Sequence, residues 1–301
     1  MRARAILNRD GGTLKTEDVA AVGERIARAF EQAGRVAEIQ VVSGADLIEA
    51  LEKAQDSDVD AIVAGGGDGT VSAAAAAAWR GGKAFGVLPA GTMNLFARSL
   101  GLPLELDAAI DALARAEPAP VDIALADGRP FVQQFSVGMH AEMVAERETL
   151  EFASRLGKIW ASVRAAGRVL ARAPSIRAEI VVDGERAAAR YNWIAVSNNP
   201  YGEGHMPYAD RVDGGVLGVY RANGLRTRGA AALAADVMRG AFQGNADLRI
   251  DHARQVEIAF PSRKAKDRAS LDGELEPLPE KVVLEILPGA LLALKPLEAT
   301  P

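Results

Sequence analysis

Short apolar segments alternate with amphipathic ones throughout residues 1–121. The apolar segments are typical of strands and the amphipathic ones of helices. A strand–helix alternation of this kind predicts a parallel sheet flanked by helices, because parallel strands need long crossover connections. We therefore predict an α/β domain over residues 1–121. Its expected strands are 3–7, 36–42, 59–64 and 85–88, and its expected helices are 16–33, 46–54, 71–79, 95–100 and 107–116.

Beyond this domain the pattern changes to a succession of strands. Asp183-Gly184 predicts a hairpin turn between two of them. A chain of 301 residues is long enough for two cores. We predict a β-rich, antiparallel, sandwich-like domain over residues 122–287, a cleft between the two domains, and a return of residues 288–301 to the first domain. The expected strands are 121–125, 131–137, 176–182, 191–197, 216–220, 248–250 and 256–260, and the expected helices are 152–172 and 227–240.

A glycine-rich turn joins the third strand to its helix and reads Gly65-Gly66-Gly67-Asp68-Gly69-Thr70. Such a turn lets backbone N–H groups approach a phosphate at a helix N-terminus. Asp68 within it would repel a phosphate unless a metal ion or a transferable proton gives the carboxylate a role. No Lys follows the glycines, so the turn is not a Walker A loop. The combination favours phosphoryl transfer, and the alternative is a purely structural turn.

Polar residues follow four of the predicted strands. They are Asn8, Ser43, the glycine-rich turn, and the segment from Pro89 to Asn94. Ligands of parallel sheets bind beyond the carboxyl ends of the strands, so we expect these loops to meet at one edge. In the last segment Gly91-Thr92 offers a close backbone approach and a hydroxyl group, and Asn94 is placed to cap the helix that follows.

Composition excludes several classes of function. The chain has 35 Lys and Arg against 40 Asp and Glu, a net charge of -5, which argues against a dedicated nucleic-acid binder. It has no Cys, and its three histidines, His140, His205 and His252, have no zinc spacing. We assign these histidines ordinary structural or surface roles. No apolar run is long enough for a signal peptide or a membrane span, so we expect a cytoplasmic protein that meets membranes only peripherally.

Two motifs together resemble the diacylglycerol kinase catalytic-domain family, which includes bacterial lipid kinases and the sphingosine and ceramide kinases. The family carries Gly-Gly-Asp-Gly-Thr and then Pro-x-Gly-Thr-x-Asn-Asp-Phe-Ala-Arg-x-Leu-Gly. This chain has the first at Gly66–Thr70 and a close version of the second at Pro89–Gly101. Asp272-Gly273-Glu274 matches the family's C-terminal Asp-Gly-Glu, and Asn8–Gly12 weakly matches its first loop, so the resemblance covers nearly the whole chain.

The resemblance implies transfer of the γ-phosphoryl group of ATP to a lipid hydroxyl group, with Mg²⁺, and diacylglycerol is the default lipid. Either Asp68 or Glu274 is the base that accepts the substrate proton, and the sequence does not choose between them. On the same resemblance we expect Asp272 to bind the metal or the nucleotide, and Asp213 is a weak match to a structural magnesium ligand. The remaining residues that we expect to contact the nucleotide are Asn8, Ser43, Gly65, Gly66, Gly67, Gly69, Thr70, Gly91, Thr92 and Asn94.

The chain also departs from the family pattern. Leu95 replaces an Asp of the second motif, and Arg9 and Gly11 replace a Pro and a Ser of the first loop. These departures motivate one rival hypothesis, a nucleotide-binding regulator that has lost turnover. A second rival is an NAD kinase, which shares Gly-Gly-Asp-Gly-Thr on a related architecture. We rank it lower because Gly91–Leu100 follows the lipid-kinase pattern.

The expected partners are a lipid substrate and the inner membrane surface, and the sequence leaves a homodimer open. Residues 152–172 combine an apolar stripe with basic residues, a pattern that suits anionic lipid. Packing of this helix on the second domain, with its basic face in water, is the favoured interpretation.

Overall fold

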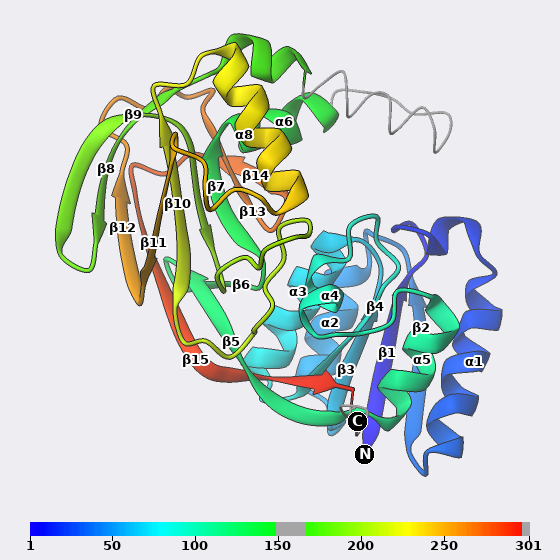
Figure 1. The fold of residues 1–301 in the computed structure, drawn as a ribbon. Helices are drawn as coiled ribbons and strands as arrows, with labels where there is room; N and C mark the ends of the chain where they lie inside the picture. The colour runs from blue at the N-terminus through cyan, green and yellow to red at the C-terminus, as the bar shows by residue number, and fades with distance from the viewer. Residues whose placement is uncertain (149–166, 297–301) are drawn as a thin grey trace. The chain divides into compact units, whose positions relative to one another are not determined.

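The computed structural model describes residues 1–148 and 167–296 of the chain (Figure 1). The chain forms two compact units. Unit 1 comprises Met1–Ile123, Arg211–Gly214 and the chain from Leu287 onward, and unit 2 comprises Ala124–Asp210 and Gly215–Ile286. The predicted fold class is confirmed, because unit 1 carries a parallel sheet with helices and unit 2 is β-rich and antiparallel. The predicted cleft between the domains stays a prediction.

Unit 1 is built on a parallel sheet with the strand order β4-β3-β1-β2. Its strands are β1 (Arg2–Asn8), β2 (Val36–Val42), β3 (Ala61–Gly65) and β4 (Ala84–Leu88). The C-terminal part of β15 (Lys281–Lys295) adds a parallel strand beside β4, with Leu292 opposite Ala84. The central strands β3 and β4 are buried over their whole length, as expected of a parallel sheet covered on both faces.

Helices cover this sheet in two groups (Figure 1). The first group is α1 (Val19–Gln32) and α5 (Leu106–Arg115), which pack against each other. The second group is α2 (Leu47–Gln55) and α3 (Asp68–Arg80). Four alanines of α3, Ala74, Ala75, Ala77 and Ala78, are buried and form the face of the helix that packs inward. A 3₁₀ turn (Leu14–Thr16) and the short α4 (Leu95–Ser99) complete the unit with the start of β5 (Glu117–Ala126).

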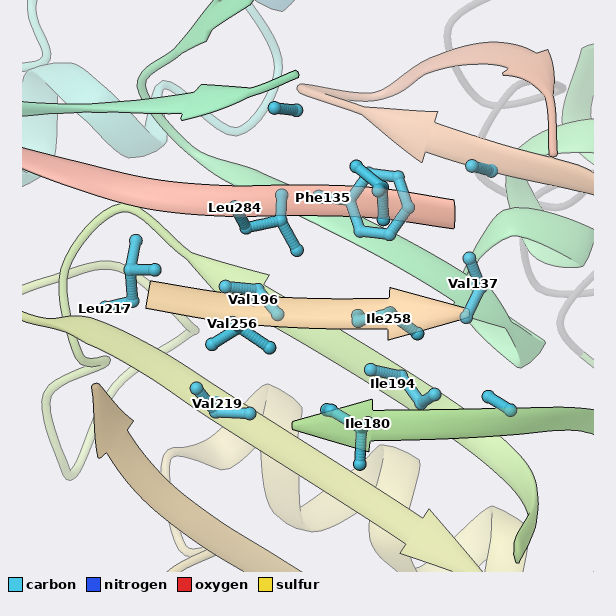
Figure 2. Packing of buried hydrophobic residues seen from close by; sticks show 14 of the residues in the cluster. Phe135, Val137, Ile180, Ile194, Val196, Leu217, Val219, Val256, Ile258 and Leu284 are labelled. Carbon is cyan, nitrogen blue, oxygen red and sulfur yellow. The ribbon is translucent and has the colours of Figure 1, made fainter. Parts of the chain in front are cut away.

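Unit 2 holds antiparallel strands that share one apolar core. The long strand β9 (Glu185–Ser197) has different partners along its length. Its first half pairs with β8 (Ile176–Val182), and its second half pairs with both β7 (Gln134–Gly138) and β10 (Leu217–Asn223). The core gathers side chains from both sets of strands, and Figure 2 shows Val256, Ile258 and Leu284 turned toward Val196, Ile194 and Phe135. The strands are β6 (Arg129–Phe131), β7 (Gln134–Gly138), β8 (Ile176–Val182), β9 (Glu185–Ser197), β10 (Leu217–Asn223), β11 (Leu248–Ala253), β12 (Gln255–Ala259), β13 (Arg268–Leu271), β14 (Glu274–Pro277) and the first part of β15.

A second apolar cluster of unit 2 lies beneath two helices, α6 (Met139–Glu148) and α8 (Thr227–Arg239). It contains Trp193 and Tyr220 from neighbouring strands and Phe242 after α8. Among the described helices, none is long and apolar enough to cross a membrane.

Several local predictions differ from the structure. Helix α3 begins at Asp68, whereas the sequence predicted a start at residue 71, so Asp68 lies in the helix and not in the tight part of the turn. The predicted strand 131–137 is two strands, β6 and β7. Helix α6 was not predicted, and neither were the strands β13 and β14. Most of the predicted helix 152–172 lies outside the described residues, and residues 167–172 are helical.

Unit 2 contains three hairpin turns made by an Asp-Gly pair. Asp127-Gly128, Asp183-Gly184 and Asp272-Gly273 all have positive φ at both residues. This is the geometry of a type I′ turn, which Asp-Gly pairs favour. The turn predicted at Asp183-Gly184 is confirmed, since Val182 and Glu185 pair across it.

Candidate functional site

The loops that carry the predicted site residues of unit 1 lie along one edge of its sheet. Asn8 is level with Val42, and Gly65 is level with both Leu7 and Leu88. The four strands therefore end together, as the βαβ pattern predicted. Ser43, the glycine-rich turn and the segment from Pro89 continue from these ends.

The glycine-rich turn leads directly into α3. Gly67 occupies the N-cap position and, as a glycine, has no side chain to cap the helix. A Cβ on Gly66 would lie 2.5 Å from Oγ1 of Thr70, whereas a Cβ on Gly67 would meet no atom within 4 Å. Gly66 is therefore required by packing, while Gly67 faces open space. Asp68 and Gly69 are half-buried in the first helical turn, where N–H groups and the helix dipole favour an anion.

Asn8 ties the first loop to the glycine-rich turn. Its Nδ2 donates to Oγ1 of Thr70 at 3.1 Å, and both residues are buried. Its Oδ1 accepts from the backbone N–H of Asp10 at 3.0 Å, and the Asp10 carboxylate accepts from the N–H of Gly44 at 2.8 Å. Asn8, Thr70 and Asp10 thus hold three loops together. The Ser43 hydroxyl donates to the Asp46 carboxylate at 2.5 Å, so a nucleotide would compete with this bond.

The second motif is shaped by Asn94, which has a left-handed backbone with a φ of 52°. Its Oδ1 accepts from the N–H of Gly91 at 2.7 Å, and its Nδ2 donates to the carbonyl of Pro89 at 3.2 Å. Asn94 is the N-cap residue of α4, as predicted, but its side chain makes no cap bond and closes the preceding loop instead. A Cβ on Gly91 would lie 3.8 Å from Oδ1 of Asp68, so the two motifs are neighbours, and Thr92 is exposed beside them.

Asp272 and Glu274 lie in unit 2 and have very different surroundings. Asp272 is 2% exposed, and its carboxylate accepts from three successive backbone N–H groups, those of Val132, Gln133 and Gln134, at 2.8 to 3.0 Å. A carboxylate has about four acceptor positions, so this one is largely committed to the backbone. Glu274 is exposed at the start of β14. Asp68 belongs to unit 1, so the choice between Asp68 and Glu274 as the base stays open.

Asp213, the weakly predicted magnesium ligand, belongs to unit 1. Its carboxylate accepts from Nε of Arg211 at 3.2 Å. Within the described part of the chain, no group of three His, Cys, Asp or Glu residues is placed to hold a metal ion. The magnesium site at Asp213 stays a prediction.

Sequence reasoning missed a polar group on the helix-covered face of unit 2. It consists of Gln134 and Ser136 on β7, His140 on α6, and Tyr201. Residues two apart in a strand share a face, so the polar pair at 134 and 136 within an apolar run was a usable signal. Burial raises the pKa of Tyr201 well above its ordinary value and that of Tyr220, on which it stacks, to about 12.

Comparisons with known proteins agree with this architecture. The family model of the diacylglycerol kinase catalytic domain matches residues 2–126. The model of the YegS C-terminal NAD kinase beta sandwich-like domain matches residues 134–295, more than half of the chain. An α/β unit with a glycine-rich turn at one edge of its sheet and an antiparallel β unit therefore define the class of protein. The chain belongs to the family that joins a diacylglycerol kinase catalytic domain to a YegS C-terminal domain.

Individual relatives match over shorter stretches. A Klebsiella pneumoniae protein named "Probable lipid kinase YegS-like" is 36% identical over 104 residues, covering 34% of this chain and 35% of that protein. The diacylglycerol kinase of Bacillus subtilis is 33% identical over 127 residues, covering 40% of this chain and 41% of that protein. These matches thus span well under half of each relative. A crystal structure described as a diacylglycerol kinase from Bacillus anthracis str. Sterne shares the fold, with a TM-score of 0.71 at 20% identity over 98% of this chain and 96% of that one.

Proposed function

We propose that this protein transfers the γ-phosphoryl group of ATP to the hydroxyl group of a lipid. The observation that carries the proposal is the junction of β3 and α3. There a helix N-terminus whose cap residue is a glycine and a carboxylate, Asp68, lie beside the Gly91 loop in a member of this family. Backbone N–H groups at a helix N-terminus suit phosphate oxygens. A carboxylate at the same place suits a reaction in which a proton is removed or a metal ion neutralises charge.

The residues at this edge fit a triphosphate. The open side of Gly67 gives phosphate oxygens access to the first-turn N–H groups of α3, and the exposed Thr92 adds a hydroxyl donor. Asn8 and Thr70 bond to each other across two loops, and Asn94 closes its own loop, so these three residues shape the edge more than they face a ligand. Bound ATP supplies the transferable phosphoryl group, and Mg²⁺ supplies charge neutralisation.

The proton of the attacking lipid hydroxyl needs an acceptor, and Asp68 and Glu274 are the candidates. Neither carboxylate is buried, since Asp68 is half-exposed and Glu274 is exposed. Asp272 is better suited to fixing the turn that presents Glu274 than to binding a ligand, because its oxygens accept three backbone bonds. We propose that the lipid is a diacylglycerol, met at a membrane surface, because the Bacillus subtilis relative is named a diacylglycerol kinase.

An NAD kinase is the second candidate function. It is favoured by the description of the C-terminal model as NAD kinase beta sandwich-like. A nucleotide-binding regulator without turnover is the third, motivated by Leu95 at the start of α4, where the family pattern has an Asp. Retention of both Asp68 and Glu274 argues against the regulator.

A product assay separates these functions. The purified full chain is incubated with Mg²⁺ and ATP labelled in the γ-phosphoryl group. Diacylglycerol, monoacylglycerol, phosphatidylglycerol, sphingosine and ceramide are presented in separate mixed micelles, and NAD is presented in buffer. We expect label in a lipid product, strongest with diacylglycerol, and loss of labelling when the metal is chelated. Label in NADP alone would replace the proposal with NAD kinase, and ATP binding without any labelled product would support the regulator.

A further inference from the structure

A chain of hydrogen bonds runs through unit 2 beside the Asp272-Gly273-Glu274 turn. The Oε1 atom of Gln134 accepts from the Tyr201 hydroxyl, and its Nε2 lies 3.3 Å from Nε2 of His140. The other ring nitrogen of His140, Nδ1, lies 2.7 Å from Oγ of Ser136. Tyr201 is itself fixed, because its ring stacks on Tyr220 with centroids 4.6 Å apart. Its backbone N–H also donates to the Tyr220 hydroxyl at 2.7 Å.

This chain reaches the turn through the backbone of Gln134. The N–H of Gln134 donates to Oδ1 of Asp272 at 3.0 Å, and the N–H of Asp272 donates back to the carbonyl of Gln134 at 2.9 Å. Helix α6, which carries His140, packs against both strands that the turn connects, β13 and β14. The side chain of Gln134 and the turn that bears Glu274 therefore depend on the same short piece of backbone.

The bonding pattern fixes where the protons lie. Burial keeps the Tyr201 hydroxyl protonated, so it donates to Oε1 of Gln134. The Gln134 NH₂ group must then face His140, and Nε2 of His140 must accept. With the Gln134 amide in this orientation, the two bonds of the ring fit a neutral His140 whose Nδ1 donates to Ser136. A proton added at Nε2 of His140 would point an N–H group at the NH₂ group of Gln134, and two donors cannot form a hydrogen bond with each other.

We propose that His140, acting through Gln134, is a positioning residue that holds the Asp272-Gly273-Glu274 turn in the geometry required for phosphoryl transfer. The inference rests on the proposed function and assigns His140 a role only in its neutral form. Besides Glu142 and Glu146 of α6 itself, the described segments that contact this helix carry these charged or titratable groups: Arg168 and Arg172, both paired with Glu146, Glu185, Arg186, Arg190 and Tyr191 of β9, Arg268 of β13, Asp272 in the turn, and Glu274 and Glu276 of β14.

The substitution Gln134→Glu tests the role, because a carboxylate accepts from both neighbours and so matches a protonated His140. An unperturbed histidine titrates near pH 6.5, so kcat is compared at about pH 6 and about pH 8. The ratio of kcat at the lower pH to kcat at the higher pH should be at least about threefold greater in Gln134→Glu than in the wild type, with the KM for ATP unchanged. Gln243→Glu, at an exposed glutamine of the same unit, is the matched control and should keep the wild-type ratio. Equal ratios in Gln134→Glu and the wild type would overturn the inference.

A second measurement needs no activity. The chain has only three histidines, so His205→Asn and His252→Asn together leave the imidazole signals of His140 alone in a long-range ¹⁵N–¹H NMR spectrum. We expect a neutral ring protonated at Nδ1, and a ring protonated at Nε2 would overturn the inference. A wild type that phosphorylates no lipid would overturn the proposed function and, with it, the catalytic role of His140. An active wild type with the other tautomer would overturn this inference alone.

Discussion

The Asp272 carboxylate holds the Asp-Gly-Glu turn through hydrogen bonds to the backbone, and a substitution at Asp272 measures how much these bonds stabilise the protein. The substitution Asp272→Asn keeps a residue type that tolerates the left-handed backbone found there, with a φ of 49°. One oxygen remains to accept from Gln133 and Gln134, but the new NH₂ group faces the N–H of Val132, which loses its acceptor. The substitution thus removes one bond, weakens two others and leaves one buried donor unpaired.

These changes add up to a large loss of stability. A buried donor without a partner costs about 1 to 3 kcal/mol, and replacing a charged acceptor by a neutral one weakens each remaining bond by about 1 kcal/mol. Removal of a buried charge offsets part of this loss, so we expect a decrease of about 3 kcal/mol in the free energy of unfolding. For a unit of this size, that corresponds to a Tm lower by roughly 6 to 12 °C.

Thermal denaturation followed by circular dichroism measures the effect, and Asp183→Asn is the matched control. Asp183 occupies the same position of an Asp-Gly turn, has a φ of 46°, and is exposed. The control should change the free energy of unfolding by no more than about 0.5 kcal/mol. If Asp272 were chiefly a ligand of metal or nucleotide, its carboxylate would be available for a partner. Its replacement would then leave Tm unchanged or raise it, and that outcome would refute the structural role.

Three further predictions follow from the same contacts. Gly67→Ala should lower the free energy of unfolding by no more than about 1 kcal/mol, because its Cβ meets no atom within 4 Å and only the N-cap preference for Gly over Ala is lost. It should weaken ATP binding measured by calorimetry, and unchanged affinity would place the phosphates elsewhere. Asn94→Gly keeps the left-handed backbone but loses both side-chain bonds, so we expect a loss of about 1 to 2 kcal/mol in urea denaturation, and no loss would contradict the loop-closing role. Tyr201 and Tyr220 have pKa values raised by burial, so the stability they contribute is present below pH 10 and is lost as pH rises, for Tyr220 through about 12. Above pH 10 the free energy of unfolding should fall by about 1.4 kcal/mol per pH unit for each tyrosine. Absorbance follows the ionisation of the tyrosines, and ionisation of both near pH 10 without unfolding would contradict this prediction.

The sequence predicted the parts of the fold that depend on local pattern. The βαβ alternation of unit 1 placed Asn8, Ser43 and the glycine-rich turn at one sheet edge, because strand ends follow from strand order. The same pattern misplaced Asp68, because the glycines were interpreted as a long turn. In the structure α3 begins directly after its N-cap residue, Gly67. A helix start with no side-chain cap carries little signal of its own.

The contacts that the sequence missed join residues far apart in the chain. The strand predicted over 131–137 divides between β6 and β7, and the connecting N–H groups of Val132 and Gln133 bond to Asp272, about 140 residues away. No local sequence pattern predicts a hydrogen bond between residues so far apart. The role of Asn94 was misjudged for a related reason, because an Asn before a helix predicts a cap equally well when its side chain turns back to the preceding loop.

The central claim is that the carboxylate at the start of α3 serves phosphoryl transfer to a lipid. Its most direct test is the kcat of Asp68→Asn with labelled ATP and diacylglycerol micelles, together with its affinity for ATP. Asp111→Asn, at an exposed aspartate of α5, is the control. We predict that Asp68→Asn folds and binds ATP but loses about 10² to 10⁴-fold in kcat, while the control keeps full activity. Wild-type turnover by Asp68→Asn would contradict the account.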